Sequence, residues 1–310
     1  MPLGYEGKLY VLAFDHRGSF QKQLFGITGQ PDEKETRRVA DAKRVILAGL
    51  VQAVESGIPR EWAGALVDEQ FGAAIAREAR SRGLLLAMPA EKSGQDEFDF
   101  EYGDDFGAHI ETFDPDFVKV LVRYNPEGDR EMNMRQAERL RVLSDWLHER
   151  GRKFLFELLI PAEGHQLELV EGDAGRYDRE LRPRLLLETM KELRAAGVEP
   201  DVWKIEGLDS REDCRRTAEV ARAGGRDRVV CVVLGRGASD EAVEHWLRQG
   251  AGVPGYVGFA IGRTFWWEPL LRHRDGEIDA AEAASAIAEK YRHMVDVYES
   301  ATREHARTAA

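Results

Sequence analysis

The chain has 310 residues, of which 43% are hydrophobic and 32% charged, a balance typical of a globular protein with ample core material. Forty-four basic against 56 acidic residues give a net charge of -12, which disfavours nucleic acid and anionic membranes as partners. The longest apolar runs, such as 229–235, are far shorter than the roughly 18 residues of a membrane helix. The N-terminal sequence lacks a secretion signal and the two cysteines give no disulfide framework, so we expect a cytoplasmic protein.

Short runs rich in β-branched or aromatic residues recur along the chain, and helix-period segments separate them. The runs predict strands at 8–15, 64–68, 84–89, 117–124, 153–161, 201–207, 228–235 and 255–262. The helix-period segments lie at 36–56, 70–82, 130–150, 178–196, 210–224 and 239–249. Segment 90–116 is acidic and punctuated by glycine, and we expect a short helix inside a long loop there.

Eight strands that alternate with helices predict an α/β fold, a (β/α)8 or TIM barrel. We find no linker, repeat or low-complexity segment, so residues 1–310 are expected to form a single domain with a C-terminal helix at about 279–306. A doubly wound sheet is the structural alternative.

Ionisable residues fall on the inward side of several predicted strands. Side chains alternate between the barrel interior and the helix layer, so residues of one parity share a side. Trp203 and Ile205 face the helices, which turns Lys204 inward. The same rule places further charged residues inside the barrel: Asp15, Asp68, Lys119, Arg123, Glu157 and Glu206. A packed interior has no use for so many charges, but the C-terminal mouth of a barrel carries the active site.

Each of these residues also has an ordinary structural interpretation. A single inward lysine or glutamate is often half of an ion pair, and Asp15 before His16 could simply cap the next helix. Lys119 and Arg123 could line the wall with their charged ends at the rim. Taken together, the residues favour a catalytic cluster.

A strand lysine beside a carboxylate suits Schiff-base chemistry. A neutral lysine attacks a ketone and forms an iminium ion, which accepts electrons when the neighbouring C–C bond breaks. Burial of Lys204 and a second cation such as Lys119 would both promote loss of its proton. Glu157 suits the proton transfers. This is the reaction of a class I aldolase, a lyase.

Two Gly-Arg turns end the last two predicted strands. Gly235, Arg236 and Gly237 follow the seventh strand, and Gly262 and Arg263 follow the eighth. The loops after these strands are where barrels most often bind phosphate, because glycines let the backbone approach and arginines supply charge. Either turn alone could be an ordinary strand exit, but the pair favours a phosphate site.

Several motifs in matching order resemble a known family: LAFDHRGSF, LVDEQFG, AEKSGQD, KVLVRYN, FLFELLIP, WKIEGL and GFAIGRTFW. Over about residues 8–270 the chain resembles the barrel domain that follows the kinase in bifunctional 5-dehydro-2-deoxygluconokinase proteins of myo-inositol catabolism. It is more distantly similar to class I tagatose 1,6-bisphosphate aldolases. The resemblance implies that Lys204 is the Schiff-base lysine and Glu157 its acid/base partner. It also implies pocket positions for Asp15, Arg17, Lys92, Lys119 and Arg263.

The resemblance suggests a phosphorylated sugar substrate, 2-deoxy-5-keto-D-gluconate 6-phosphate, that is cleaved to dihydroxyacetone phosphate and malonic semialdehyde. Arg17, Lys92 or Arg123 would then hold the carboxylate of the substrate, and no cofactor or metal is expected. The chain departs from the tagatose-type pattern at His16 and in VRYN after strand four, which disfavours a bisphosphate. The kinase is absent from this sequence, so another chain would supply the substrate.

Several alternatives stay open. Aldolases for tagatose or fructose bisphosphate or for a sulfosugar phosphate are the nearest, and a non-catalytic barrel that binds a sugar phosphate is another. A zinc aldolase is disfavoured because only His16 and His165 of the eight histidines lie near strand ends. Asp15, Asp68 and Glu69 could hold Mg²⁺. The sequence leaves the oligomeric state open, a homo-oligomer included.

Overall fold

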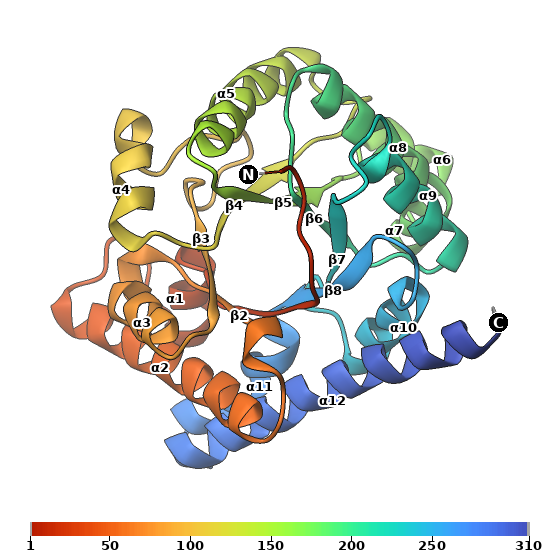
Figure 1. Ribbon diagram of the computed structural model, residues 1–310. Helices are drawn as coiled ribbons and strands as arrows, with labels where there is room; N and C mark the ends of the chain where they lie inside the picture. Colours follow the sequence, from red (N-terminus) through yellow and green to blue (C-terminus); the bar gives the residue numbers. More distant parts are fainter. Residues whose placement is uncertain (1, 309–310) are drawn as a thin grey trace.

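The computed structural model describes residues 2–308, and its centre is a closed barrel of eight parallel strands (Figure 1). Each strand pairs with the next, and β8 returns to β1. The strands are β1 (Leu9–Ala13), β2 (Ala63–Leu66), β3 (Leu85–Pro89), β4 (Phe117–Arg123), β5 (Lys153–Leu159), β6 (Val202–Glu206), β7 (Val230–Leu234) and β8 (Tyr256–Ile261). The predicted TIM barrel is confirmed, and the doubly wound alternative is wrong because the sheet closes.

Helices form a ring around the barrel (Figure 1). They are α1 (Gly18–Phe25), α2 (Glu33–Glu55), α3 (Glu69–Ser81), α4 (Phe106–Phe113), α5 (Arg130–Glu149), α6 (Gly164–Leu169), α7 (Ala174–Arg176), α8 (Arg182–Ala195), α9 (Arg211–Arg222), α10 (Asp240–Gly250), α11 (Arg263–Arg274) and α12 (Ala280–Thr308). Short 3-10 turns cover Arg60–Trp62 and Gly103–Asp105, and a π-helical turn, Tyr177–Leu181, leads into α8. Many of these helices begin at a capping side chain, as α2 does at Asp32 and α5 at Asp129.

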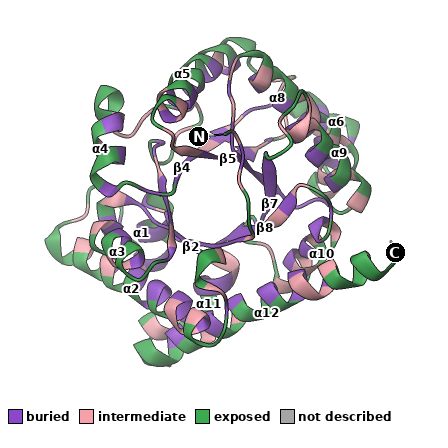
Figure 2. Cartoon of the chain, in the orientation of Figure 1, coloured by how far each residue is buried: buried purple, intermediate pink, exposed green. Residues whose placement is uncertain are grey.

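The packing has two layers, as the alternation of side chains along the strands predicts. An inner core fills the barrel, and its members are Leu9, Val11, Ala13, Leu66, Ala87, Phe117, Leu155, Val202, Val230, Val232 and Ala260. A larger outer core lies between strands and helices and contains Val118, Val120, Trp203 and Ile205. Figure 2 shows that the strands are buried while the helices keep an exposed outer face. The predicted parities of β1, β4, β5 and β6 are therefore confirmed.

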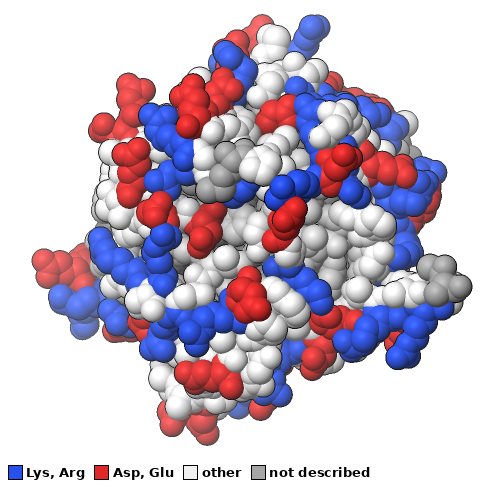
Figure 3. Space-filling view, in the orientation of Figure 1, with Lys and Arg blue, Asp and Glu red and all other residues white. Residues whose placement is uncertain are grey.

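The N-terminal segment crosses the end of the barrel at which the strands begin (Figure 1). The backbone N–H of Gly4 donates to Asp201 Oδ1 at 2.7 Å, and that of Tyr5 to the carbonyl of Arg228 at 2.9 Å. The Tyr5 ring packs edge-on against Phe117, with ring centroids 5.2 Å apart. Acidic and basic side chains lie interspersed over the face in Figure 3. The N-terminal segment is therefore held in place over the end of the barrel at which the strands begin.

The C-terminal helix α12 packs against α2, α10 and α11. It packs tightly over Gly49 of α2, where a Cβ atom would lie 2.7 Å from Ile287 Cγ2. Glu299 of α12 also accepts from Lys8 and Tyr10, which anchors the helix to β1. In the range 2–308, no helix is both long and apolar enough to cross a membrane.

Candidate active site

Two lysines and three carboxylates converge at the C-terminal end of the barrel. Lys119 Nζ lies 2.8 Å from Asp15 Oδ2, 2.7 Å from Glu91 Oε1 and 3.0 Å from Glu157 Oε2. Lys204 Nζ lies 2.9 Å from the same Glu157 Oε2. All five residues are at most 7% exposed. Lys204 therefore points inward, and Glu157 bridges the two ammonium groups.

Strand register brings this cluster together. Glu157 pairs with Lys204 across β5 and β6, so the two side chains leave the wall at the same height. Lys119 pairs across β4 and β5 with Leu155, which precedes Glu157 by two residues. The long side chain of Lys119 extends along the barrel axis and reaches the carboxylate of Glu157. The charged residues thus come from adjacent strands whose inward positions match.

The charges of the cluster stabilise one another. Burial alone would lower the pKa of Lys119, but Asp15, Glu157 and Glu91 outweigh it and raise that pKa well above its usual range. Burial alone would likewise raise the pKa of Asp15 and of Glu157. Lys119 nevertheless holds both pKa values below the usual carboxyl range, with help from Lys204. Lys119 is thus a fixed cation that forms ion pairs with all three carboxylates.

Glu91 differs from the other two carboxylates. Burial raises its pKa despite the nearby charges of Lys119 and Arg17. Across residues 2–308, no group hydrogen-bonds to its buried Oε2 atom, and the same holds for His16 Nδ1 and Arg17 Nε. These three buried atoms all border the cluster, and buried polar atoms are normally hydrogen-bonded. Their position is typical of a functional site.

His16 lies at the end of β1 beside the cluster. Its Nδ1 is 3.9 Å from Asp15 Oδ1, and its ring packs edge-on against Trp266. Burial lowers the pKa of His16 to about 4, assisted by Arg263 and opposed by Asp15. The imidazole is therefore neutral near pH 7.

The side chain of Arg17, which follows β1, extends toward the segment after β3. Its guanidinium already has hydrogen-bond partners there. Its Nη1 is 2.7 Å from Glu101 Oε2, and its Nη2 donates to the carbonyl of Glu91 at 2.5 Å. Lys92 is exposed. Arg123 donates to a backbone carbonyl of the segment between β3 and α4 at 2.8 Å. The three cations expected to hold a substrate carboxylate thus line the same side of the barrel, but they do not form one cluster.

The turn after β7 has a left-handed backbone. Arg236 has φ 53° and Gly237 has φ 71°. The Arg236 side chain turns toward two carboxylates, with Nε 3.0 Å from Glu206 Oε1 and Nη1 2.7 Å from Asp178 Oδ2. Gly235 is buried in front of this turn. The charge of Arg236 is therefore largely offset within the protein.

The turn after β8 brings Arg263 next to this loop. Its Nη2 donates to the carbonyl of Arg236 at 3.1 Å, and a Cβ atom on Gly237 would lie 2.9 Å from its guanidinium. Position 262 requires glycine, because a Cβ atom there would lie 2.1 Å from the carbonyl oxygen of Ala13. Arg263 forms no ion pair among residues 2–308, so it retains more free positive charge than Arg236.

The inward placement predicted for Asp68 is wrong. Strand β2 ends at Leu66, and the chain turns outward, so that Asp68 caps α3 by accepting from the N–H of Phe71 and pairs with Lys43 of α2. Glu69 pairs with His109 at 2.8 Å. Neither residue belongs to the cluster. Within the described range, no three His, Cys, Asp or Glu side chains are arranged to hold a metal ion.

Sequence reasoning missed several charged residues at the mouth. They are Glu91, Glu101, Asp178 and Arg182, and Arg182 Nε lies 2.9 Å from Asp178 Oδ1. The parity of β3 could have found Glu91, because it continues the inward series of Ala87. The others lie on loops and helix starts, where no strand alternation applies.

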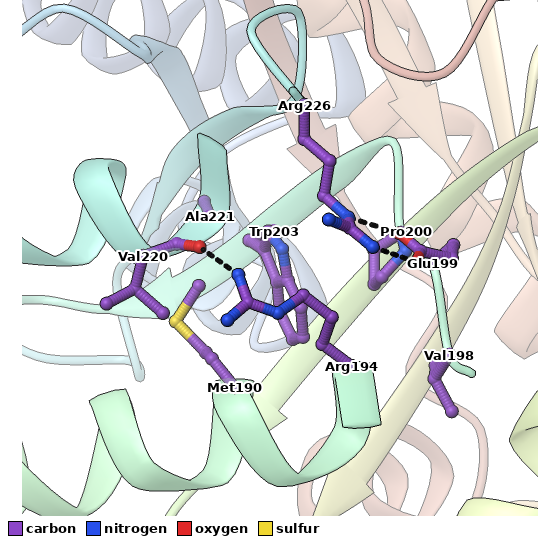
Figure 4. A pocket seen from close by; sticks show the side chains of 9 residues that line it. All are labelled: Met190, Arg194, Val198, Glu199, Pro200, Trp203, Val220, Ala221 and Arg226. Atoms are coloured by element: carbon purple, nitrogen blue, oxygen red, sulfur yellow. Dashed lines mark hydrogen bonds and ion pairs between the residues drawn. The ribbon is translucent and has the colours of Figure 1, made fainter. Parts of the chain in front are cut away.

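A separate shallow pocket lies on the outside of the barrel between α8 and α9 (Figure 4). Its arginines already have partners. Arg226 Nε donates to Glu199 at 2.6 Å, and Arg194 donates to the carbonyl of Val220 at 3.2 Å. Trp203, on the outer side of β6, forms part of its wall. This pocket is at the end where the strands begin, away from the lysines.

Comparison with solved structures supports the fold. A fructose-bisphosphate aldolase from Plasmodium falciparum, solved with TRAP and a small-molecule inhibitor, superposes with a TM-score of 0.67 at 12% identity. The match covers 94% of this chain and 91% of that one. The protein Cgl0159 of Corynebacterium glutamicum gives 0.56 at 17% identity, over 94% and 88%. At such identities the likeness concerns the fold alone.

The sequence comparisons are more limited. No curated protein matches the chain. The family model described as "Uncharacterized protein conserved in bacteria (DUF2090)" matches residues 5–302. That match covers nearly the whole chain, and the protein therefore belongs to the DUF2090 family.

Proposed function

We propose that this protein is a class I aldolase in which Lys204 forms the Schiff base. The observation that carries the proposal is the pairing of buried Lys204 with Glu157 at 2.9 Å at the mouth of an aldolase-like barrel. An amine with an adjacent proton acceptor is the arrangement that carbinolamine chemistry requires. Lys119 is unsuited to this role, because three carboxylates hold it in its charged form.

In this mechanism Glu157 first takes a proton from the Lys204 ammonium, and the neutral amine attacks the ketone carbon. A proton then passes from the attacking nitrogen to the new alkoxide, which gives the carbinolamine. Glu157 returns the proton to the carbinolamine hydroxyl, which leaves as water and yields an iminium ion. Glu157 then accepts the proton of the hydroxyl group β to the iminium carbon, and the intervening C–C bond breaks. The aldehyde departs and an enamine remains. Protonation of the enamine and hydrolysis by one water release the ketone product and restore Lys204.

For the substrate we propose 2-deoxy-5-keto-D-gluconate 6-phosphate, cleaved between C3 and C4 to dihydroxyacetone phosphate and malonic semialdehyde. The phosphate would lie at the turns after β7 and β8, with Arg263 as its main cation. The C1 carboxylate would lie near Arg17, which follows β1 but whose side chain reaches the segment after β3, and β3 is opposite β7 in a ring of eight strands. No cofactor is required, and the pathway we propose is myo-inositol catabolism in the cytoplasm.

The test is a coupled assay for dihydroxyacetone phosphate. We expect release from the keto acid phosphate by the native protein and none by Lys204→Arg, since a guanidinium stays protonated and cannot attack a ketone. Tagatose or fructose bisphosphate and a sulfosugar phosphate are run in parallel, and faster turnover of one of these would reassign the substrate. No turnover of any of them would favour a non-catalytic sugar-phosphate-binding barrel.

A further inference from the structure

Glu91 is a buried acid beside the proposed reaction centre that the mechanism above does not use. Its Oε1 lies 2.7 Å from Lys119 Nζ, and only 7% of the residue is exposed. Its Oε2 is also buried, and no described residue donates a hydrogen bond to it. Burying an ionised carboxylate costs free energy when one of its oxygens has no hydrogen-bond partner. A structural ion pair with Lys119 alone therefore does not explain why Glu91 is buried here.

Glu91 and Glu157 reach the same ammonium group from opposite sides of β4. Glu91 follows β3 and Glu157 lies on β5, and these strands flank β4, which carries Lys119. The Lys119 ammonium donates hydrogen bonds to Glu91 and Asp15 and forms an ion pair with Glu157. Three carboxylates share one cation and repel one another. If Glu91 loses its charge, Lys119 therefore stabilises the ionised forms of Asp15 and Glu157 more strongly.

The groups that face Glu91 come from several elements. Lys119 approaches from β4, and Asp15 and Arg17 from the end of β1, with Arg17 Nη2 3.8 Å from Glu91 Oε1. Glu101, which pairs with Arg17, approaches from the segment before α4. Burial is the strongest of these influences, and it leaves the pKa of Glu91 above the usual range for glutamate.

Two neighbouring ammonium groups reduce the basicity of a carboxylate such as Glu157. Lys119 and Lys204 together hold the pKa of Glu157 below its usual range, although burial acts in the opposite direction. A general base loses efficiency as its pKa falls away from the working pH. Glu91, as a further anion paired with Lys119, counteracts this loss of basicity in Glu157.

We propose that Glu91 is a positioning residue that keeps Glu157 basic enough for proton transfer by competing with it for Lys119. The role in catalysis rests on the proposed aldolase function. The charge coupling between the two glutamates does not, since it follows from the three contacts to Lys119 alone.

The test uses Glu91→Gln, which keeps the size of the side chain and an oxygen that accepts from Lys119 but removes the charge. The titration of Glu157 is followed by ¹³C NMR in protein labelled at glutamate, with its signal assigned through Glu157→Gln. We expect the midpoint to fall by roughly one pH unit in Glu91→Gln. The acid limb of kcat/KM is expected to move to lower pH by the same amount, and Glu91→Asp should restore both toward the native values.

Glu97→Gln is the matched control. It removes one carboxylate from the same segment, but Glu97 pairs with Arg135 and Arg139 on α5 and does not touch the cluster. An unmoved Glu157 midpoint in Glu91→Gln would overturn the coupling, because a purely structural hydrogen bond tolerates glutamine. A moved midpoint with an unmoved acid limb would overturn the role in catalysis. Failure of the proposed function would leave the NMR result standing, so the two failures are distinguishable.

Discussion

At the scale of single residues, Glu157 is a buried carboxylate that two lysines share. It is 6% exposed, and one of its oxygens lies within 3.0 Å of both Lys119 and Lys204. In the proposed mechanism this carboxylate passes a proton to and from Lys204, while Lys119 remains a fixed charge. The different roles proposed for the two lysines rest on the number of carboxylates that each one contacts.

The first prediction concerns Glu157→Gln. We expect turnover to fall about 10²- to 10⁴-fold, because an acid/base group contributes roughly that factor. The variant should still form some iminium with dihydroxyacetone phosphate, since the nucleophile remains. Steady-state kinetics and borohydride trapping measure the two effects separately. Native turnover in Glu157→Gln would show that another group transfers the proton.

The second prediction compares the two arginines on the phosphate side. Arg263→Ala should raise KM for a phosphorylated ketone about 10- to 100-fold, because a lost charged hydrogen bond costs about 1.5–3 kcal/mol. Arg236→Ala should have a smaller effect, since Glu206 and Asp178 already offset its charge. Equal KM values for the native protein and Arg263→Ala would remove Arg263 from the phosphate site.

Strand parity predicted the inward residues well within regular strands, and it failed for Asp68, beyond the end of β2. Lys119, Glu157 and Lys204 lie inside long or buried strands, and their sides follow from the apolar neighbours. Asp68 lies beyond the end of β2, where the chain turns outward to start α3. The partners of Arg236 could not be predicted, because they depend on how separate loops approach each other.

At the scale of elements, the strongly periodic segments were predictable, and the short helix expected within 90–116 is confirmed as α4, but other short or irregular elements were not predicted. All eight strands fall within a few residues of their predicted positions. Helix α1 has only eight residues, and α11 contains Pro269, which weakens a helical pattern. The N-terminal segment that crosses the barrel has no regular structure of its own, so no periodicity marks it.

The third prediction concerns the contact of α2 with α12. Gly49→Ala should destabilise the protein by about 1–3 kcal/mol, as overpacking does. The new Cβ would lie 2.7 Å from Ile287 Cγ2 and 2.9 Å from the carbonyl oxygen of Ala284, and backbone atoms cannot easily give way. This cost exceeds the gain of about 1 kcal/mol in helix propensity.

Urea denaturation gives the change in the free energy of unfolding for this variant. Ala48→Ser is the control, because Ala48 lies on the exposed side of the same helix and its substitution should cost about 0.5 kcal/mol or less. A Gly49→Ala protein that is more stable than the native one would contradict this prediction. It would mean that α12 can shift away from α2 to make room for the new methyl group without loss of stability.

At the scale of the whole molecule, the barrel keeps its two ends distinct. Residues 2–8 and the core side chains occupy the end where the strands begin, and the ionisable cluster occupies the other. This arrangement follows from strand direction, which the alternation of strands and helices already predicted.

The fourth prediction concerns metal removal. We expect aldol cleavage to survive dialysis against EDTA, because the positive charge that accepts electrons in the proposed mechanism is the iminium nitrogen on Lys204. Activity is measured before and after dialysis, with metal content determined in both samples. Loss of turnover that Mg²⁺ or Zn²⁺ restores would contradict the metal-free mechanism.

The central claim is that Lys204 becomes covalently bound to a ketone. The most direct measurement is borohydride reduction in the presence of dihydroxyacetone phosphate, followed by peptide mass spectrometry. We predict one reduced adduct on the peptide that contains Lys204, and none in Lys204→Arg, whose fold circular dichroism should show to be intact. An adduct on Lys119 or Lys92 with Lys204 unmodified would contradict the assignment of roles, and no adduct on any lysine would contradict the class I mechanism itself.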